Sequence, residues 1–387
     1  MSKEFKINSF FKSFADADDK LTVQLASDRL NYKLDVIPTG SMLLDDILGC
    51  GGYPCGRIIQ LYGPPGSGKS LLAMLAIKEA QKLNTESQQV FIDAENTFNA
   101  DWAMALGLDL NRIILIDEEL AVNGRRCFEM ILGEPKEDKK HVLVGKHKEG
   151  LLDQIMKKEI DINIIVLDSL GALIPPGEDT AAVGKANMAL MARFLTTTFK
   201  KLSLEVSKAN VPFLVINHKR DNMDPYGSDH TFSGGNTYAH FLSANIYFEA
   251  VMRKDAAILD EKDNKIGHII RATTEKSKFS SWPRKCEFKV NFGIGVTDKH
   301  EEIANLALEY NIVTKPTSVT HEYGDKKWVG FAKFCDALKE DPALAQEMTV
   351  KIAEARQARL DNKKNQNVTK LDEVVKVEAK KKKAKDE

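Results

Sequence analysis

Residues 63–70 have the types and spacing of a phosphate-binding loop. The segment reads Gly-Pro-Pro-Gly-Ser-Gly-Lys-Ser and fits the pattern G-x-x-x-x-G-K-[ST]. In this pattern the glycines let backbone N–H groups close around a phosphate, Lys69 reaches the β- and γ-phosphates, and the hydroxyl of Ser70 binds Mg²⁺. The predicted nucleotide contacts are Gly63, Pro64, Pro65, Gly66, Ser67, Gly68, Lys69, Ser70 and Leu71.

The flanking segments predict a strand before this loop and a helix after it. Residues 57–62 are a short apolar run, and residues 70–83 carry apolar side chains at helical spacing. The phosphates would then lie at a helix N-terminus, where free N–H groups and the helix dipole favour an anion. A fortuitous glycine-rich turn is the alternative, and the agreement of strand, loop and helix argues against it.

Acidic side chains follow two other apolar runs. Asp168 ends the run 164–167, and a carboxylate in that position can hold Mg²⁺ beside the phosphates. Asp93 and Glu95 follow the run 90–92, so they are expected at the ligand-binding edge of a parallel sheet. Glu95 could take the proton from an attacking water. The alternatives are a strand-end cap for Asp168 and a helix cap for Glu95.

Other residues at the same predicted edge have types that suit a nucleotide. The flat ring of Trp102 could stack on a base, with ordinary packing as the alternative, and Asn99 is a further predicted nucleotide contact. His218 ends the apolar run 213–216. A polar side chain there can touch the γ-phosphate and transmit hydrolysis to the segment that follows.

Two long irregular segments, 175–187 and 219–233, follow these strand ends. Loops of this length that contain glycine, proline and aromatic residues are usually functional or disordered. Cations and aromatic rings at one edge suit a single-stranded polynucleotide, because the cations meet phosphates and the rings stack on bases. Two solvated loops are the alternative. The predicted DNA-binding residues here are Lys185, Arg193, Lys219, Arg220, Tyr226 and Phe232.

The composition of the 387-residue chain is that of a globular protein, with 43% hydrophobic and 29% charged residues. The net charge of −1 means that any nucleic-acid contact must come from local patches. We expect no membrane span and no signal peptide, because no apolar run is long enough. The five cysteines are scattered without C-x-x-C spacing, which favours a reducing cytoplasm and argues against a zinc site.

The pattern along the chain predicts four regions. Residues 1–32 are polar with an aromatic cluster at helical spacing and are expected to serve oligomerisation, docking elsewhere or on a neighbouring subunit. Residues 33–297 alternate apolar strands and helices, which predicts a mostly parallel sheet that ends in antiparallel pairs. Residues 298–360 are expected to form a small mixed C-terminal domain that contacts DNA. Residues 361–387 are rich in lysine and lack aromatics, which is typical of a disordered tail.

Longer motifs across residues 30–360 resemble those of the RecA recombinases of bacteria and phages. The resemblance implies a P-loop NTPase core of the RecA-like α/β class, with a mostly parallel central sheet flanked by helices, an N-terminal docking helix and a small α/β C-terminal domain. The motifs that carry it are Ile37-Pro38-Thr39-Gly40-Ser41, the phosphate loop, Asp93-Ala94-Glu95, Val166-Leu167-Asp168-Ser169, Ile216-Asn217-His218, Gly234-Gly235-Asn236, Glu275-Lys276-Ser277-Lys278 and Asn291-Phe292-Gly293-Ile294-Gly295.

The resemblance also implies an activity and its partners. The expected protein is a DNA-dependent ATPase that forms a helical homo-oligomeric filament and pairs and exchanges DNA strands. Its partners would be single-stranded and double-stranded DNA, in the cytoplasm of a bacterium or of a phage-infected cell. The loops after Asp168 and His218 would bind DNA. The motif after the second loop adds Gly234, Gly235 and Asn236 to the predicted DNA-binding residues.

The resemblance assigns the ATP and Mg²⁺ contacts to two protomers. Lys69, Ser70 and Asp168 would serve the phosphates and the metal from one subunit, with Glu95 as the general base. The remaining contacts would come from the neighbouring subunit, whose Lys276 and Lys278 would reach the γ-phosphate.

The chain departs from the family pattern at four places. His218 stands where bacterial members have glutamine, so the γ-phosphate sensor could differ in strength or pH response. Trp102 stands where they usually have tyrosine, which should still stack. Residues 119–150 are longer than the family norm and have no assigned role. The tail is rich in lysine rather than acidic, so an inhibitory role of the tail is not carried over.

Two other functions remain open from the sequence. A hexameric ring helicase has the same core fold, but the Lys276 and Lys278 pair and the C-terminal domain with Trp328 argue against it. A DNA coat with negligible turnover is the other alternative, and Glu95 argues against that. Electron microscopy on single-stranded DNA and a DNA-stimulated ATPase assay would separate the three.

Overall fold

The structure, a computed structural model, describes most of the chain. Residues 35–353 form one compact unit, and the second unit comprises 1–34 and 354–387. The predicted N-terminal segment 1–32 and almost all of the predicted tail lie outside the described residues. The described residues are 34–117, 122–137, 143–177, 188–221, 230–232, 234–235, 237–253, 256–280 and 284–361.

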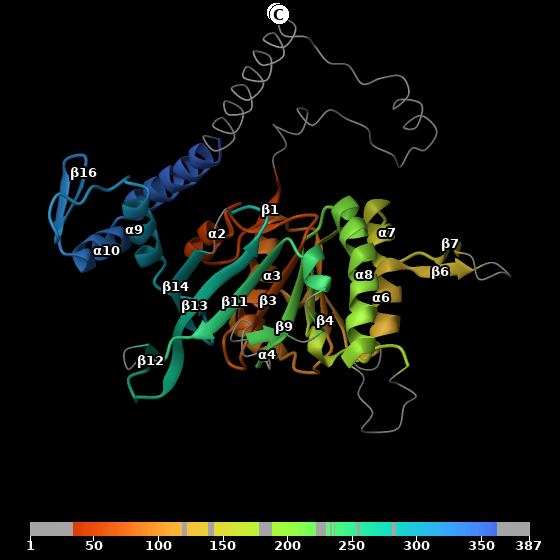
Figure 1. The fold of residues 1–387 in the computed structure, drawn as a ribbon. Helices are drawn as coiled ribbons and strands as arrows, with labels where there is room; N and C mark the ends of the chain where they lie inside the picture. The colour runs from red at the N-terminus through yellow and green to blue at the C-terminus, as the bar shows by residue number, and fades with distance from the viewer. Residues whose placement is uncertain are drawn as a thin grey trace, which may run out of the picture. The chain divides into compact units, whose positions relative to one another are not determined.

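The core of the 35–353 unit is one large sheet in the order β15-β14-β13-β11-β3-β9-β8-β4-β5 (Figure 1). The strands from β11 to β5 are parallel, and β13, β14 and β15 extend the sheet antiparallel, as predicted. Their bounds are β11 Ala244–Ala250, β3 Ile58–Gly63, β9 Phe213–Asp221, β8 Ile162–Asp168, β4 Gln88–Asp93, β5 Ile113–Ile116, β13 Lys265–Ser277, β14 Arg284–Asn291 and β15 Gly295–Val296.

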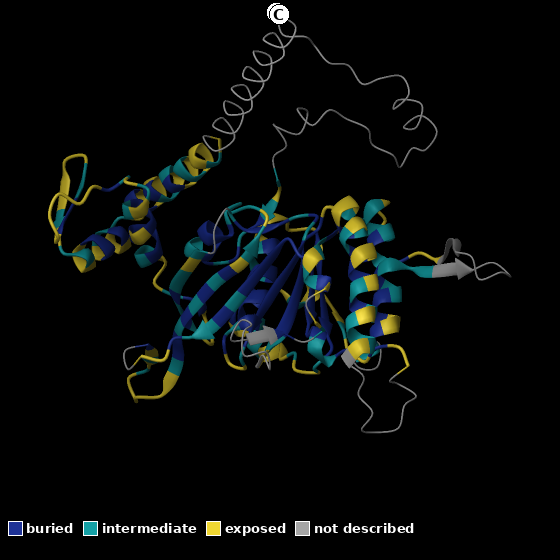
Figure 2. Ribbon diagram, viewed as in Figure 1, coloured by how far each residue is buried: buried dark blue, intermediate teal, exposed yellow. Residues whose placement is uncertain are grey.

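The predicted apolar runs form the buried centre of this sheet. β3 is buried along its whole length, and β4 and β8 are buried along almost all of theirs, because helices cover both faces (Figure 2). β5 is an exception to the prediction that every run is buried on both faces. It is the edge strand, and its Ile114 and Leu115 remain 37% and 38% exposed.

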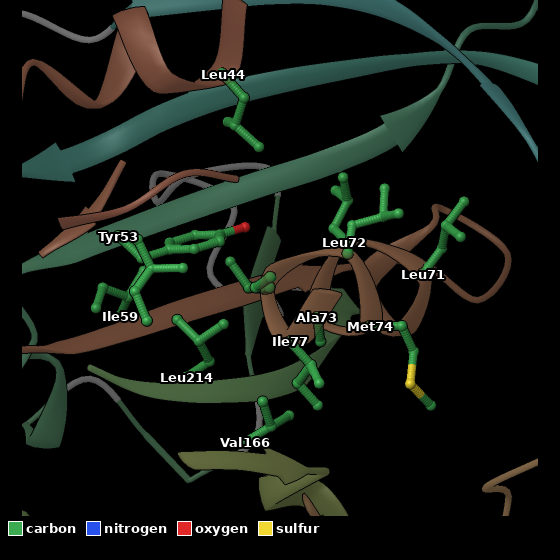
Figure 3. Packing of buried hydrophobic residues seen from close by; sticks show 14 of the residues in the cluster. Leu44, Tyr53, Ile59, Leu71, Leu72, Ala73, Met74, Ile77, Val166 and Leu214 are labelled. Carbon is green, nitrogen blue, oxygen red and sulfur yellow. The ribbon is translucent and has the colours of Figure 1, made fainter. Parts of the chain in front are cut away.

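One face of the sheet is covered by α3 (Lys69–Leu83), the helix that begins at the phosphate loop. Leu72, Ala73 and Ile77 of this helix pack in one cluster with apolar side chains of the sheet (Figure 3). The partners in Figure 3 include Ile59 of β3 and Leu214 of β9. This packing fixes the start of α3 against the carboxyl end of β3.

The other face is covered by α6 (Gly124–Leu132), α7 (Leu151–Met156) and α8 (Met188–Ala209), which lie together in Figure 1. Phe128, Leu152 and Phe199 of these helices join a second buried cluster with strand residues. Short elements complete the unit: β1 Val36–Ile37, α2 Met42–Leu48, β2 Tyr53–Pro54, α4 Ala100–Ala105, η2 Leu110–Arg112, η3 Leu170–Ala172, β10 His230–Phe232, η4 Tyr238–Phe241 and β12 Ala257–Leu259.

The region predicted as a small mixed domain has its own apolar cluster, centred on Phe334. Its hairpin turns at Tyr323-Gly324-Asp325, as predicted. Glu302 connects this region to the start of α2, because its carboxylate accepts hydrogen bonds from Ser41 Oγ at 2.7 Å and Met42 N at 2.8 Å. The boundary near residue 297 stays a prediction. The elements are α9 Lys299–Glu309, β16 Thr320–Tyr323, β17 Lys326–Val329 and α10 Phe331–Glu340, followed by helical residues from 342 onward.

The unusually long segment 119–150 contains a two-stranded hairpin. β6 (Glu134–Glu137) pairs with β7 (Leu143–Lys148) in a sheet of their own. In Figure 1 the hairpin extends outward beyond α6 and α7. The hairpin lies on the side of the helices, and its two strands do not pair with strands of the central sheet.

Among the described residues, no helix is both long and apolar enough to cross a membrane. All five cysteines are free thiols.

Candidate functional site

The phosphate loop connects the buried strand β3 to α3. Gly66 and Gly68 have φ values of 72° and 87°, in the left-handed region that favours glycine. A side chain at Gly68 would meet Ile270 Cδ1 at 2.3 Å, and one at Gly63 would meet the carbonyl oxygen of Phe248 at 2.1 Å. The loop therefore keeps its turn only with glycine at these positions.

The side chain of Lys69 folds back over the loop. Its Nζ donates to the carbonyl oxygens of Gly63 and Pro64 at 3.1 and 2.8 Å. Burial lowers the pKa of Lys69, and the nearby carboxylates of Asp168 and Glu95 oppose that effect. Phosphate oxygens could replace the two carbonyl oxygens as acceptors for this ammonium group, so the residue fits the predicted role.

Ser70 and Asp168 come together at the start of α3. Ser70 Oγ donates to Asp168 Oδ2 at 2.7 Å, and burial raises the pKa of Asp168 to about 6. A hydroxyl and a buried carboxylate beside a phosphate loop are the oxygen ligands that Mg²⁺ takes in nucleotide sites, where phosphates and waters complete its shell. The two side chains therefore fit a nucleotide-bound Mg²⁺.

Glu95 lies next to this pair and is held by two partners. His218 Nε2 is 2.6 Å from Glu95 Oε1, and Ser169 Oγ donates to the same oxygen. The hydrogen bond with His218 is the largest cause of a lowered pKa of Glu95. Ser169 has no role in the sequence-based prediction. Its position directly after a strand-ending Asp168 was the only signal for it.

The other nucleotide contacts predicted from the sequence lie around α4. Asn99 caps this helix, its side chain accepting from Trp102 N at 2.8 Å. Trp102 Nε1 donates to the carbonyl oxygen of Phe292 at 2.5 Å. Sequence reasoning gave Phe292 no role, although it is an aromatic residue in a glycine-rich motif and remains 39% exposed. The carboxylate of Asp93 accepts hydrogen bonds from Thr97 N and Phe98 N, so it holds the turn after β4.

The predicted DNA-binding residues are only partly described. Arg193 is exposed on α8 and Arg220 is exposed at the end of β9. Lys219 Nζ lies 6.0 Å from the ring centroid of Tyr247. Gly234 and Gly235 have left-handed φ values of 94° and 76°. Lys185, Tyr226 and Asn236 lie outside the described residues.

The prediction that the ring of Phe232 is available to stack on a base is wrong, because the ring is buried. The ring is only 9% exposed and packs edge-on against Tyr62 and Tyr238. The reason is the hairpin at the base of the predicted loop, where β10 pairs with the end of β9 and turns Phe232 into the core. The irregular segment is therefore shorter than 219–233.

Lys276 and Lys278 lie at the opposite edge of the sheet from the phosphate loop. Lys276 pairs in register with Asn245, which pairs with Gln60 in the middle of β3. Lys278 N donates to Ser243 O, and Ser243 N donates to Ile58 O at the start of β3. The five steps from Ile58 to Gly63 span ~16 Å at about 3.3 Å per residue. Lys276 is level with Gln60, three steps or about 10 Å before Gly63, and its Nζ donates to the carbonyl oxygens of Ala239 and His240. Along the strand direction, both lysines therefore lie away from the phosphate loop of their own chain.

Comparison with known proteins agrees with this geometry. The RecA N-terminal domain family matches residues 7–132 and 144–297. The chain belongs to the RecA family. It is a RecA-type, ATP-dependent DNA strand-exchange recombinase of recombination and repair, as the sequence motifs implied. The match leaves out residues 133–143, which hold β6 and the first residue of β7, while the rest of β7 lies within the match.

The RecA proteins similar to this chain match it over most of their length. Protein RecA of Porphyromonas gingivalis is 32% identical over 324 residues, which cover 83% of this chain and 85% of that relative. Protein RecA of Bacteroides thetaiotaomicron is 32% identical over 328 residues, which cover 84% of this chain and 88% of that relative. Protein RecA of Helicobacter pylori is 31% identical over 331 residues, which cover 85% of this chain and 86% of that relative.

The buried carboxylate of Asp168 gives a prediction about stability. Its raised pKa means that the folded state binds this proton more tightly than the unfolded state. The group therefore contributes most to the free energy of unfolding below about pH 4, and that contribution is lost as the pH rises to about 6. At about pH 7.5, Asp168→Asn should raise the free energy of unfolding of the nucleotide-free protein by about 2–3 kcal/mol.

Urea unfolding at several pH values measures this difference. The gain should shrink toward zero by about pH 3, where the carboxyl group is protonated in both the folded and the unfolded parent. Asp161→Asn, at an exposed acidic residue, is the matched control and should change little. A gain that does not depend on pH would show that the Asp168 charge is not its cause.

Proposed function

We propose that this protein is a DNA-dependent ATPase that assembles as a helical filament on single-stranded DNA and exchanges strands with duplex DNA, in the cytoplasm of a bacterium or of a phage-infected cell. The observation that carries the proposal is the pairing of Ser70 with the buried Asp168 beside a glycine-rich phosphate loop. Glu95 lies next to that pair and supplies a candidate base. Family membership supports the DNA partner.

In this proposal each side chain at the loop has one task in ATP hydrolysis. Lys69 leaves its carbonyl partners and binds the phosphates, while Ser70 and Asp168 hold Mg²⁺. The metal, when bound, neutralises charge that develops on the phosphates. Glu95 orients the attacking water and accepts its proton. Ser169 holds the Glu95 carboxylate in position.

His218 has a resting and a working position in this proposal. The contact with His218 lowers the pKa of Glu95 and so makes the carboxylate a weaker base. When ATP is bound, His218 moves to the γ-phosphate and frees Glu95. Because His218 lies in β9 just before the second predicted DNA loop, the same movement alters that loop.

The neighbouring subunit completes the site in this proposal. Lys276 and Lys278 lie level with the middle and the start of β3, toward the edge of the sheet that is opposite their own phosphate loop. A head-to-tail assembly of protomers would bring that edge to the next protomer's phosphate loop. Cations supplied in trans would then couple ATP binding to filament assembly, as an arginine finger does.

The role of Glu95 predicts a separation of binding from turnover. Glu95→Gln should keep nucleotide affinity and lower DNA-stimulated ATP hydrolysis by about 10²–10⁴-fold, because the amide keeps the size but cannot accept a proton. Fluorescent-nucleotide binding and phosphate release measure the two effects. Glu86→Gln, at an exposed position, is the control. If binding is lost together with turnover, Glu95 is structural.

The trans position of the lysines predicts complementation in mixed filaments. Lys69→Ala and the double variant Lys276→Ala, Lys278→Ala should each have little ATPase activity. A mixture should recover part of it, because a double-variant protomer can hydrolyse ATP beside a Lys69→Ala neighbour that supplies the lysines. ATPase rates across mixing ratios test this. Strict additivity at every ratio would count against trans action, and Lys262→Ala, Lys265→Ala is the control for lost surface charge.

The two positions of His218 predict that DNA affinity depends on the nucleotide. Single-stranded DNA should bind more tightly with a non-hydrolysable ATP analogue than with ADP, and His218→Ala should shrink that difference. Fluorescence anisotropy at fixed salt measures both affinities, because phosphate contacts make binding strongly salt-dependent. His300→Ala on α9 is the control. Equal affinity in the two nucleotide states of the parent would refute the switch.

A further inference from the structure

A chain of buried hydrogen bonds crosses the sheet on the face that α8 covers. Asn217 Nδ2 donates to Tyr238 Oη at 2.8 Å and to Gln60 Oε1 at 3.3 Å. Gln60 Nε2 donates to Asn245 Oδ1 at 2.9 Å, and Asn245 Nδ2 reaches Glu275 Oε2 at 3.4 Å. Tyr238 Oη also donates to Gln60 Oε1 at 2.5 Å. We call these five residues the polar bridge.

One end of the polar bridge holds the residue that faces the nucleotide. Asn217 Oδ1 accepts from the backbone N–H of His218 at 2.8 Å. The side chain of Asn217 therefore uses both its carbonyl and its amide group, one toward His218 and one toward the interior of the sheet. A movement of the His218 backbone, as the strand end follows the imidazole, would change or break the hydrogen bond to Asn217 Oδ1.

The other end holds the lysine that faces the neighbouring protomer. Lys276 directly follows Glu275, and its Nζ donates to the carbonyl oxygens of Ala239 and His240 at 2.6 and 3.2 Å. Both carbonyls belong to η4, the short helix that begins at Tyr238. Tyr238 thus joins the two ends directly, and Gln60 and Asn245 join them through the sheet.

The burial of this network limits how it can move. Gln60, Asn217 and Tyr238 are fully buried, so a polar atom that loses its partner finds no water to replace it. Side chains in such a network change between discrete hydrogen-bonded arrangements rather than by small independent shifts. A rearrangement at Asn217 is therefore passed on to Tyr238 and Gln60.

We propose that the polar bridge couples the two ATP sites that each protomer serves. His218 responds to the nucleotide of its own chain, and Lys276 acts on the nucleotide of the neighbour. The bridge makes the position of one depend on the other, so that ATP bound at one site favours the active arrangement at the next. Its members are positioning residues. The inference rests on the proposed function, because it needs Lys276 to act in trans.

The test compares two variants that each remove one buried tyrosine hydroxyl. Tyr238→Phe removes a hydroxyl that bridges Asn217 and Gln60. Tyr53→Phe removes a hydroxyl that has no hydrogen-bond partner among the described residues. Both rings are fully buried, so the control matches the size and burial of the change. Glu275→Ala is the third variant, because it removes the exposed end of the polar bridge, together with the acceptor of the hydrogen bond from Tyr62 Oη.

The readout is the Hill coefficient of DNA-stimulated ATP hydrolysis against ATP concentration. We expect a coefficient above one for the parent and for Tyr53→Phe. It should fall to about one in Tyr238→Phe and in Glu275→Ala, while turnover at saturating ATP stays within about tenfold of the parent. A merely structural defect would lower turnover or the melting temperature and leave the coefficient unchanged.

The outcomes separate this inference from the proposed function. If the parent hydrolyses ATP on DNA without cooperativity, or if Tyr238→Phe and Glu275→Ala keep the coefficient of Tyr53→Phe, the inference alone is overturned. If the parent shows no DNA-stimulated hydrolysis at all, the proposed function fails and the inference fails with it.

Discussion

The register of the parallel strands is the constraint on which the site depends. Gly63 at the end of β3 pairs with His218 in β9, and Asp93 at the end of β4 pairs with Asp168 in β8. The polar residues at the ends of β3, β9, β4 and β8, which are far apart in sequence, therefore lie together at one edge of the sheet. A shift of one residue in any pair would turn its side chains to the opposite face. The two apolar clusters that clamp the sheet are what prevent such a shift.

Much of this arrangement is predictable from the residues. Continuous apolar runs bounded by polar residues locate the buried strands, and the glycine-rich loop with Lys69 and Ser70 locates the phosphates. The antiparallel end of the sheet follows from strands that are too closely spaced for crossover helices. Asp168 follows in turn from its place at the end of a buried strand beside that loop, although Asp93 at the end of β4 shows that such a carboxylate can also hold a turn.

Other features depend on tertiary contacts that no local pattern encodes. Phe232 is an aromatic residue in a polar segment, and only the pairing of β10 with β9 makes it a core residue. β5 has the same apolar composition as its neighbours, but its place at the edge leaves it half-covered. The contact between Glu95 and His218 joins residues 123 positions apart. Lys185, Tyr226 and Asn236 lie outside the described residues, so their DNA-binding roles stay predictions.

The opposite placement of the phosphate loop and the two lysines has a consequence for how an assembly would grow. A contact that joins different surfaces of identical subunits does not close on itself unless the rotation between subunits completes a ring, so it generates an open polymer. Such a polymer has two chemically different ends, one exposing an unused phosphate loop and the other an unused pair of lysines. Growth and loss of subunits would then differ at the two ends, and the filament would have a direction along its DNA.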